Sequence, residues 1–282
     1  MPKTGEMLTL RVPWWARISI FAVAILLSAS VSLSAQWLHY PTPGIPRTPG
    51  GKPNLSARVP KMPDGKPDLS GIWNIEDAPG QTQFLDIAPS VPGGLPYRPG
   101  VAESAKAKSA PPKTGEPITR CLPIGIVERH TWIGGLKKIV QLPGLVLILN
   151  EYNASFRQIF TDGRPLPTID QPSWDGYSVG KWEGDTLVVQ TTGFRDGIWL
   201  DTEAHPLTDF AKVTERFRRA DFGHMEIQIT VDDPKAYTKP FTFKVNQVLV
   251  PDTELIEFIC LENEKDVQHM NAATQKAGGE RK

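Results

Sequence analysis

Glu215 is the side chain in this sequence best suited to acid–base chemistry. It lies in an alternating stretch, 213–218, where it shares a face with Val213 and Phe217. Such alternation is typical of a strand with one buried face, so we expect Glu215 to point inward among apolar groups. A buried carboxylate is costly unless it is paired. Glu215 therefore either meets an inward arginine as a structural pair, or serves as a ligand anchor or general acid/base.

His205 is the second candidate, in a loop that also carries Asp201 and Glu203. These groups could form an acid–base pair or bind a cation, whereas many loops of this composition are simply solvated. The chain has no H-E-x-x-H, H-x-H or Cys/His zinc spacing, so we predict no metal site. His224 is expected at a turn, facing outward beside an arginine.

Arginines and tryptophans near turns supply candidate ligand contacts. An arginine at the mouth of a barrel could bind a carboxylate through two parallel hydrogen bonds. Arg164 could equally form a structural ion pair with Asp162 or Glu151, and Trp182 could line a pocket. The predicted ligand contacts are Arg157, Trp182, Arg164, Glu151 and His224, and the possible catalytic groups are Glu215 and His205.

Composition and motifs exclude several classes of function. Acidic and basic residues number 31 each, so no broad basic field is present to attract nucleic acid. The sequence has no G-x-G-x-x-G and no P-loop, which leaves a nucleotide cofactor without support. We expect neither a cofactor nor a nucleic-acid partner.

The elements that must position these residues are short strands joined by turns. The alternating or apolar segments after residue 118 are 138–142, 145–152, 156–161, 176–182, 186–192, 213–218, 224–232, 241–250 and 254–261. Their connections carry Pro-Gly, Asp-Gly and Glu-Gly-Asp turn signals. We predict an all-β fold, an antiparallel meander that closes as a lipocalin-like barrel, with a β-sandwich as the alternative.

One hairpin allows a prediction of register. Matching the apolar faces of 213–218 and 224–232 pairs Phe217 with Met225, and Glu215 with Ile227. The polar face then pairs arginines with His224 and Glu226, which is favourable for an outer surface.

The chain begins with a segment typical of export. Residues 1–35 combine a positive start, an uncharged apolar run and small residues near Ala35, which indicates a signal peptide. An uncut membrane anchor is the alternative. With cleavage, we expect no stable membrane span and a periplasmic or extracellular location.

A proline-rich arm follows at 36–117, with a possible first strand at 71–76 and a loop at 100–117. Within it, GKPNLS at 51–56 returns as GKPDLS at 65–70, and this duplication could dock a protein partner. The barrel domain is predicted at 118–265, and the arm and barrel precede a polar tail at 266–282.

The two cysteines are Cys121 and Cys260. In an oxidising compartment such a pair tends to become a disulfide. Closing a loop of about 140 residues would stabilise the fold by roughly 4–5 kcal/mol in a chain-entropy estimate. Two buried free thiols are the alternative, since sequence does not give the separation of the Cα atoms.

Several strings together resemble a family of exported bacterial proteins of unknown function, common in soil lineages such as the acidobacteria. They are DGKPDLSGIW at 64–73, CLP at 121–123, RQIFTDGR at 157–164, YSVGKWEGDTL at 177–187 and much of 213–238. The likeness covers about 45–268 and implies membership without a function. The Gly-x-Trp opening at 71–73 is also similar to lipocalin-type barrels, which implies a ligand cavity.

These observations favour an exported protein that binds a small apolar or amphipathic molecule. A lyase, hydratase or isomerase on the same barrel, using Glu215 or His205, is the second hypothesis. An envelope assembly protein that docks through the proline-rich arm is the third.

Overall fold

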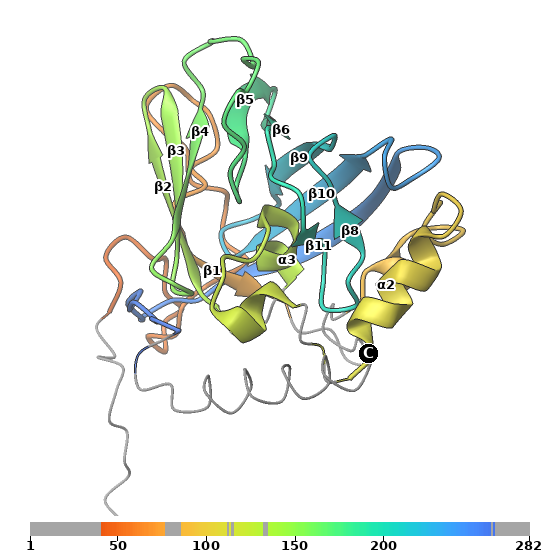
Figure 1. The fold of residues 1–282 in the computed structure, drawn as a ribbon. Coiled ribbons are helices and arrows are strands. Elements are labelled where there is room, and N and C mark those ends of the chain that lie inside the picture. The colour runs from red at the N-terminus through yellow and green to blue at the C-terminus, as the bar shows by residue number, and fades with distance from the viewer. Residues whose placement is uncertain are drawn as a thin grey trace, which may run out of the picture. The chain divides into compact units, whose positions relative to one another are not determined.

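The structure is a computed structural model that describes residues 41–76, 86–111, 113, 116–131, 135–260 and 262. Nine strands close a barrel in the order β1, β11, β10, β9, β6, β5, β4, β3 and β2, and β2 pairs with β1 (Figure 1). This confirms the predicted all-β barrel. The barrel strands are β1 Gly71–Ile75, β2 Lys137–Leu142, β3 Leu145–Asn150, β4 Phe156–Phe160, β5 Tyr177–Glu183, β6 Thr186–Thr192, β9 Lys212–Arg219, β10 His224–Asp232 and β11 Phe241–Leu249.

Smaller elements connect and cover the barrel. A two-stranded sheet pairs β7 Ile198–Trp199 with β8 Pro206–Leu207. The helices are η1 Ala88–Ser90, α2 Val101–Ser109, η2 Pro117–Arg120 and α3 Ile126–Thr131. Helix α2 occupies half of the segment expected as a loop at 100–117, so that expectation was wrong for residues 101–109. Short alanine- and lysine-rich stretches have high helix propensity. The helix begins directly after Gly100, whose backbone has a left-handed conformation.

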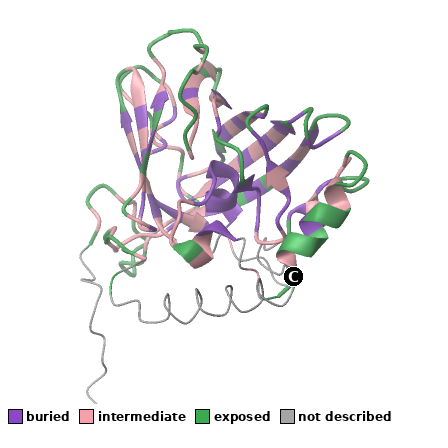
Figure 2. Cartoon of the chain, in the orientation of Figure 1, coloured by how far each residue is buried: buried purple, intermediate pink, exposed green. Residues whose placement is uncertain are grey.

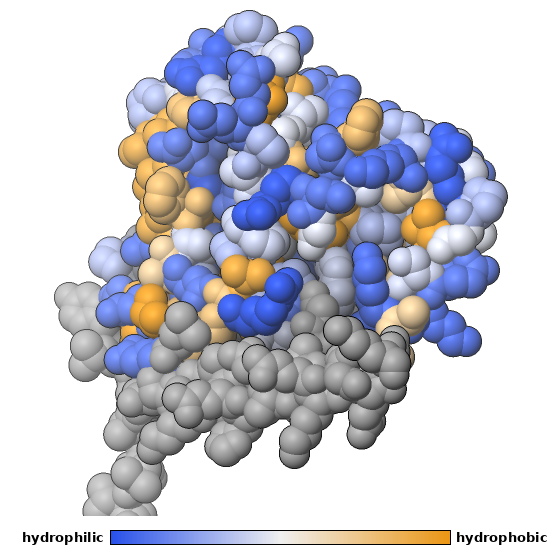
Figure 3. Space-filling view, in the orientation of Figure 1, coloured by the Kyte–Doolittle hydropathy of each residue, from blue (hydrophilic) through white to orange (hydrophobic). Residues whose placement is uncertain are grey.

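The strand alternation explains the barrel wall. In β10 every second residue from Met225 to Val231 is buried, and the residues between them are half-buried. Leu145, Leu147 and Leu149 of β3 are half-buried on the outer face, so the barrel exterior is apolar there. Figure 3 shows apolar side chains gathered on the left of the view, over β2, β3 and β4.

The β9–β10 register differs from the prediction by two residues. Phe217 pairs with Ile227, and Glu215 pairs with Ile229. The turn keeps the expected length but is centred one residue later, at Phe222, where the Asp221 carboxylate accepts hydrogen bonds from the backbone of Gly223 and His224. A shift of two preserves the side-chain face, so Glu215 points inward as predicted.

Two further details of the sheet depart from the prediction. The pair β4–β5 is parallel and joins at two positions only, Ile159 with Ser178 and Phe160 with Val179. The segment 254–261 is not a strand; within its described residues it makes a single bridge, from Phe258 to Tyr152. Its backbone is instead fixed by Glu151 and Asn153.

The duplicated motif of the arm forms two equivalent turns. Arg47 bridges Pro53 in the first turn, and Lys61 bridges Pro67 in the second. The chain between them packs on the barrel: the backbone oxygen of Leu55 accepts a bond of 2.7 Å from Gly223. The described part of the arm is therefore attached to its own barrel.

The barrel interior is filled by side chains and closed at one end by α3. All six residues of α3 are buried, whereas only Ala105 of α2 is (Figure 2). The backbone oxygen of His130 in α3 accepts a bond from the Gln247 side chain of β11, which fixes the helix to the wall.

The cysteine pair is a disulfide with Cα atoms 5.4 Å apart. It joins the residue after η2 to the segment that follows β11. The predicted signal peptide at 1–35 and the tail at 266–282 lie outside the described residues. Among the described helices, none has the length and apolar character needed to cross a membrane.

Candidate functional site

An ion-paired cluster lies inside the barrel, around Glu215 of β9. Arg157 of β4 donates to both carboxylate oxygens of Glu215, and one of these bonds measures 2.9 Å. Arg157 also donates to Ser178 at 3.0 Å and to Thr191 at 2.9 Å. His130 Nε2 lies 2.8 Å from the same carboxylate. The structure thus joins two predicted site residues, Glu215 and Arg157, as a buried pair.

The electrostatics of this cluster do not favour Glu215 as an acid/base. Burial would raise the pKa of Glu215, but the charge of Arg157 and the hydrogen bond from His130 outweigh it and hold the pKa at about 2. Burial lowers the pKa of His130 to about 4, so the ring is neutral near pH 7. Glu215 is therefore a permanent carboxylate with both oxygens engaged, as in the structural-pair interpretation.

A small space lies inside the barrel beside this cluster. A space of about 10 Å³ lies between α3 and the inward faces of β2, β3 and β4, enough for about one water. His130 and Lys137 line it, and burial lowers the pKa of Lys137 to about 7. Glu215 lines neither this space nor any of the three larger pockets of the described chain, so these pockets give no support to Glu215 as a ligand anchor.

A larger cleft opens in the barrel wall where β4 and β5 diverge. It has a volume of about 390 Å³ and lies beside the two positions at which these strands pair. Its aromatic lining comes from Phe156, Phe160, Trp174 and Tyr177. Arg157 and Ser178 also line it, so the cleft reaches the buried ion-paired cluster.

The cleft contains an ion pair whose hydrogen-bonding capacity is incompletely used. Arg129 Nη1 of α3 lies 2.8 Å from Asp175 Oδ2, and both residues line the cleft. Arg129 Nε and Asp175 Oδ1 are buried without a hydrogen-bond partner among the described residues. One unpaired donor and one unpaired acceptor thus lie in the same cleft, where a bound molecule or water could satisfy them.

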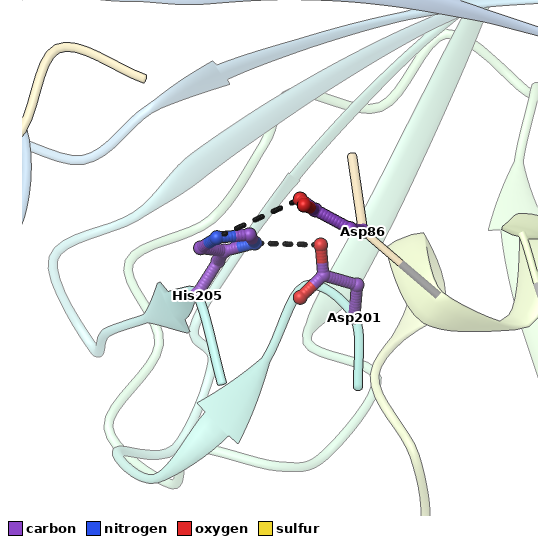
Figure 4. A group of neighbouring side chains, drawn as sticks. All are labelled: Asp86, Asp201 and His205. Carbon is purple, nitrogen blue, oxygen red and sulfur yellow. Dashed lines mark hydrogen bonds and ion pairs between the residues drawn. The ribbon is translucent and has the colours of Figure 1, made fainter. Parts of the chain in front are cut away.

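His205 belongs to a different group of side chains. It lies between β7 and β8, with Nδ1 2.6 Å from Asp201 Oδ2 and Nε2 3.8 Å from Asp86 Oδ1 (Figure 4). Within the described chain it makes no hydrogen bond or ion pair with Glu215, and the two predicted catalytic residues share no hydrogen-bond partner. Glu203, the other predicted oxygen donor of this loop, instead forms an ion pair with Lys113 at 3.1 Å.

The remaining predicted ligand contacts are distributed elsewhere. Trp182 packs against the core and, with Arg164, lines a separate pocket of about 400 Å³. Arg164 pairs with Asp162 at 2.6 Å, as in its structural interpretation. His224 Nδ1 lies 2.7 Å from Asp221, so its partner is an aspartate and not the expected arginine.

Glu151 has a structural role in the C-terminal segment. Its two carboxylate oxygens accept backbone bonds from Leu136 at 3.0 Å and Ile256 at 3.4 Å. Both oxygens are thereby occupied at the edge of the sheet, so the structure does not place Glu151 with the other predicted ligand contacts.

Sequence reasoning missed Lys137, Arg129 and Asp175. Lys137 alternates with buried Ile139 in β2, so the strand pattern placed it on the inward face. Arg129 and Asp175 lie on a short helix and in a loop, where no periodicity indicates a direction. Only the folded chain brings these two together, 46 positions apart in sequence.

Comparison with known proteins adds no assignment. No protein-family model and no curated protein matches this chain. The resemblance to exported bacterial proteins therefore stays a prediction, and the cleft between β4 and β5 is the candidate site that the geometry itself supplies.

Proposed function

We propose that the protein binds a small amphipathic molecule in the cleft between β4 and β5. The observation that carries this proposal is the unpaired donor and acceptor of Arg129 and Asp175 at a cleft walled by aromatic rings. Ligand sites typically combine apolar walls with a few fixed polar groups. The cleft has both.

The chemistry of the lining defines the ligand class. Phe156 is 61% exposed, and its ring can cover a flat apolar body. A ligand group with both an acceptor and a donor would complete the hydrogen bonds of Arg129 Nε and Asp175 Oδ1. We therefore propose a planar, mostly apolar molecule with one polar end.

The site is held rigid by the barrel. Arg157, at the inner end of the cleft, is fixed by Glu215, Ser178 and Thr191. Arg129 is held by α3, all of which is buried. Such fixed groups lose little conformational entropy on binding.

Titration with anilinonaphthalene sulfonate, a planar apolar probe with a polar end, tests the proposal. We expect saturable binding at one site by fluorescence, weakened roughly tenfold by Phe156→Ala, which corresponds to about 1.4 kcal/mol. Arg129→Gln should also weaken it, because the guanidinium that would bind the sulfonate is lost.

Phe210→Ala is the matched control, since Phe210 is 64% exposed and does not line the cleft. It should bind the probe as the wild type does. Absence of saturable binding, or equal affinities for Phe156→Ala and Phe210→Ala, would contradict a site in this cleft.

An enzyme that uses Glu215 as its acid/base has less support, because that carboxylate is locked in an ion pair. Export and a protein partner for the arm stay as proposals. A deletion of residues 41–70 would expose the part of the barrel that they contact. A test for loss of a protein partner in that variant therefore requires a control that shows the variant still folds.

A further inference from the structure

A histidine and two carboxylates lie close together at the β7–β8 hairpin, and none of the three residues lines the cleft. We propose that His205 and Asp86 bind a divalent transition-metal ion such as Zn²⁺, with Asp201 orienting the imidazole. The proposal is independent of the ligand cleft and adds a metal site where sequence spacing had predicted none.

The local fold sets the orientation of the ring. Asp201 is fully buried, and its Oδ2 accepts a bond of 2.7 Å from the backbone of Ile87. The same oxygen lies 2.6 Å from His205 Nδ1. Because an ionised carboxylate only accepts, Nδ1 donates and the lone pair of a neutral ring lies on Nε2. The bond to Ile87 also brings the preceding residue, Asp86, close to Asp201, and Figure 4 shows both carboxylates on the same side of the ring.

The distance between the two proposed ligand atoms fits an ion. His205 Nε2 and Asp86 Oδ1 are 3.8 Å apart, too far for a hydrogen bond. Two bonds to zinc of about 2.0–2.1 Å each can span up to about 4.2 Å. His205 is only 7% exposed, and its Nε2 has no hydrogen-bond partner in the described part of the chain. A ring nitrogen without a hydrogen-bond partner in the described chain thus lies near a carboxylate, across a gap of suitable width.

Asp201 has the place of an orienting carboxylate. A metal-bound histidine usually donates its other ring N–H to such a group, which fixes the tautomer and increases the basicity of the ligand nitrogen. One imidazole and one carboxylate suit zinc and related transition metals, whereas calcium and magnesium prefer oxygen ligands alone. Water would complete the coordination, because Asp86 has a side chain 45% exposed.

Burial and the carboxylates of this region affect the titratable groups around the proposed site. Glu128 of α3 is 2% exposed, and its Oε2 has no hydrogen-bond partner among the described residues. Burial and the charges of Glu116 and Asp201 raise the pKa of Glu128 to about 8. Burial and the charges of Asp201 and Asp86 likewise raise the pKa of Tyr97. A bound cation would offset the negative potential of these carboxylates.

Zn²⁺ titration of the chelator-treated protein, measured by competition with a chromophoric zinc indicator, tests the site. We expect one Zn²⁺ per chain and a loss of affinity of more than tenfold in Asp86→Asn and in His205→Gln. Asp86→Asn changes a partly exposed side chain, so it keeps the measurement valid if His205→Gln does not fold. Zn²⁺ should also raise the Tm of the wild type but not that of Asp86→Asn, because an ion that binds the native state stabilises it.

His224→Gln is the matched control. His224 also pairs with an aspartate, at 2.7 Å, but no second carboxylate lies within ion-pair distance of its ring in the described chain. It should bind Zn²⁺ as the wild type does. The proposal is overturned if the wild type does not bind Zn²⁺, if Asp86→Asn binds it with unchanged affinity, or if His224→Gln loses it equally.

Discussion

A buried carboxylate that is paired with an arginine stays ionised. Glu215 is such a carboxylate, so its role is structural. The side chain is fully buried and makes an ion pair with Arg157 that Ser178 and Thr191 extend. Its charge is compensated only while Arg157 and His130 stay in place. The cluster therefore constrains the packing of β4, β6 and β9, and we expect its variants to act on stability first.

Glu215→Gln should destabilise the protein by about 3–5 kcal/mol, because the Arg157 charge would lose its buried partner. Chemical denaturation followed by tryptophan fluorescence measures this. Glu183→Gln is the control: Glu183 pairs with Arg216 at 3.0 Å on the surface, and its loss should cost at most about 1 kcal/mol. Equal effects of the two substitutions would show that the inner pair is not buried as described.

His130 should make stability depend on pH. Its folded-state pKa is about 4 against 6.5 for the free side chain, so the unfolded state binds more protons between these values. Stability from this group is present above pH 6.5 and is lost as the pH falls toward 4. The free energy of unfolding of the wild type should therefore fall relative to that of His130→Gln over this window, by about 3 kcal/mol at most.

The comparison with His130→Gln is necessary because Glu128 acts in the opposite direction. Its pKa of about 8 lies above the ordinary value of 4.5, so its contribution falls as the pH rises through that range. Glu128 is present in both proteins and cancels in the difference. A difference that stays constant from pH 6.5 to 4 would contradict a buried neutral His130.

At the scale of elements, the proline-rich arm is part of the barrel's packing. The backbone of Phe222 and Gly223, in the β9–β10 turn, donates to the backbone of Ala57 and Leu55. A Cβ added at Gly223 would lie 3.0 Å from the Leu55 Cα, so the turn and the arm fit only with glycine there. The two turns of the duplicated motif flank Leu55 and position it against Gly223.

Gly223→Ala should consequently destabilise the fold by about 1–3 kcal/mol through overpacking. Gly50→Ala is the matched control, because an added Cβ there meets only Thr48 Oγ1, at 3.9 Å, and should change stability by about 0.5 kcal/mol or less. Thermal unfolding of both variants measures the difference. If Gly223→Ala is as stable as Gly50→Ala, Leu55 of the arm does not pack closely against the β9–β10 turn.

At the scale of the whole molecule, the disulfide joins parts of the chain 139 positions apart. Cys121 leads through Leu122 to Pro123, which lines the cleft. Asn153 connects the same regions, since its side chain bonds the Cys121 oxygen at 3.1 Å and the Cys260 nitrogen at 3.2 Å. The bond thus anchors the final described segment beside the proposed ligand site.

The double variant Cys121→Ala, Cys260→Ala should lose about 2–5 kcal/mol of stability, because its unfolded chain is no longer cross-linked. Denaturation with and without reductant provides the test: reductant should destabilise the wild type and leave the double variant unchanged. A wild type insensitive to reductant under denaturing conditions would contradict the bond.

The sequence by itself determined the class of fold and the direction of many side chains. Alternation of period two fixes which residues face inward, so the inward placement of Glu215 survived a register error of two residues. Turn residues marked most strand ends. The prediction of a strand at 254–261 was wrong. Its apolar residues favour a strand, but its backbone forms hydrogen bonds with Glu151 and Asn153 instead of with a neighbouring strand.

Only the tertiary structure decided which of these side chains meet. The pairing of Glu215 with Arg157, of Arg129 with Asp175 and of His205 with Asp86 joins residues that are distant in sequence. A local pattern specifies a face but not the partner across the barrel, because partners depend on strand order and on the packing of α3. The candidate ligand site accordingly lies in the wall, where β4 and β5 diverge, and not in the interior cavity that the resemblance to lipocalin-type barrels implies.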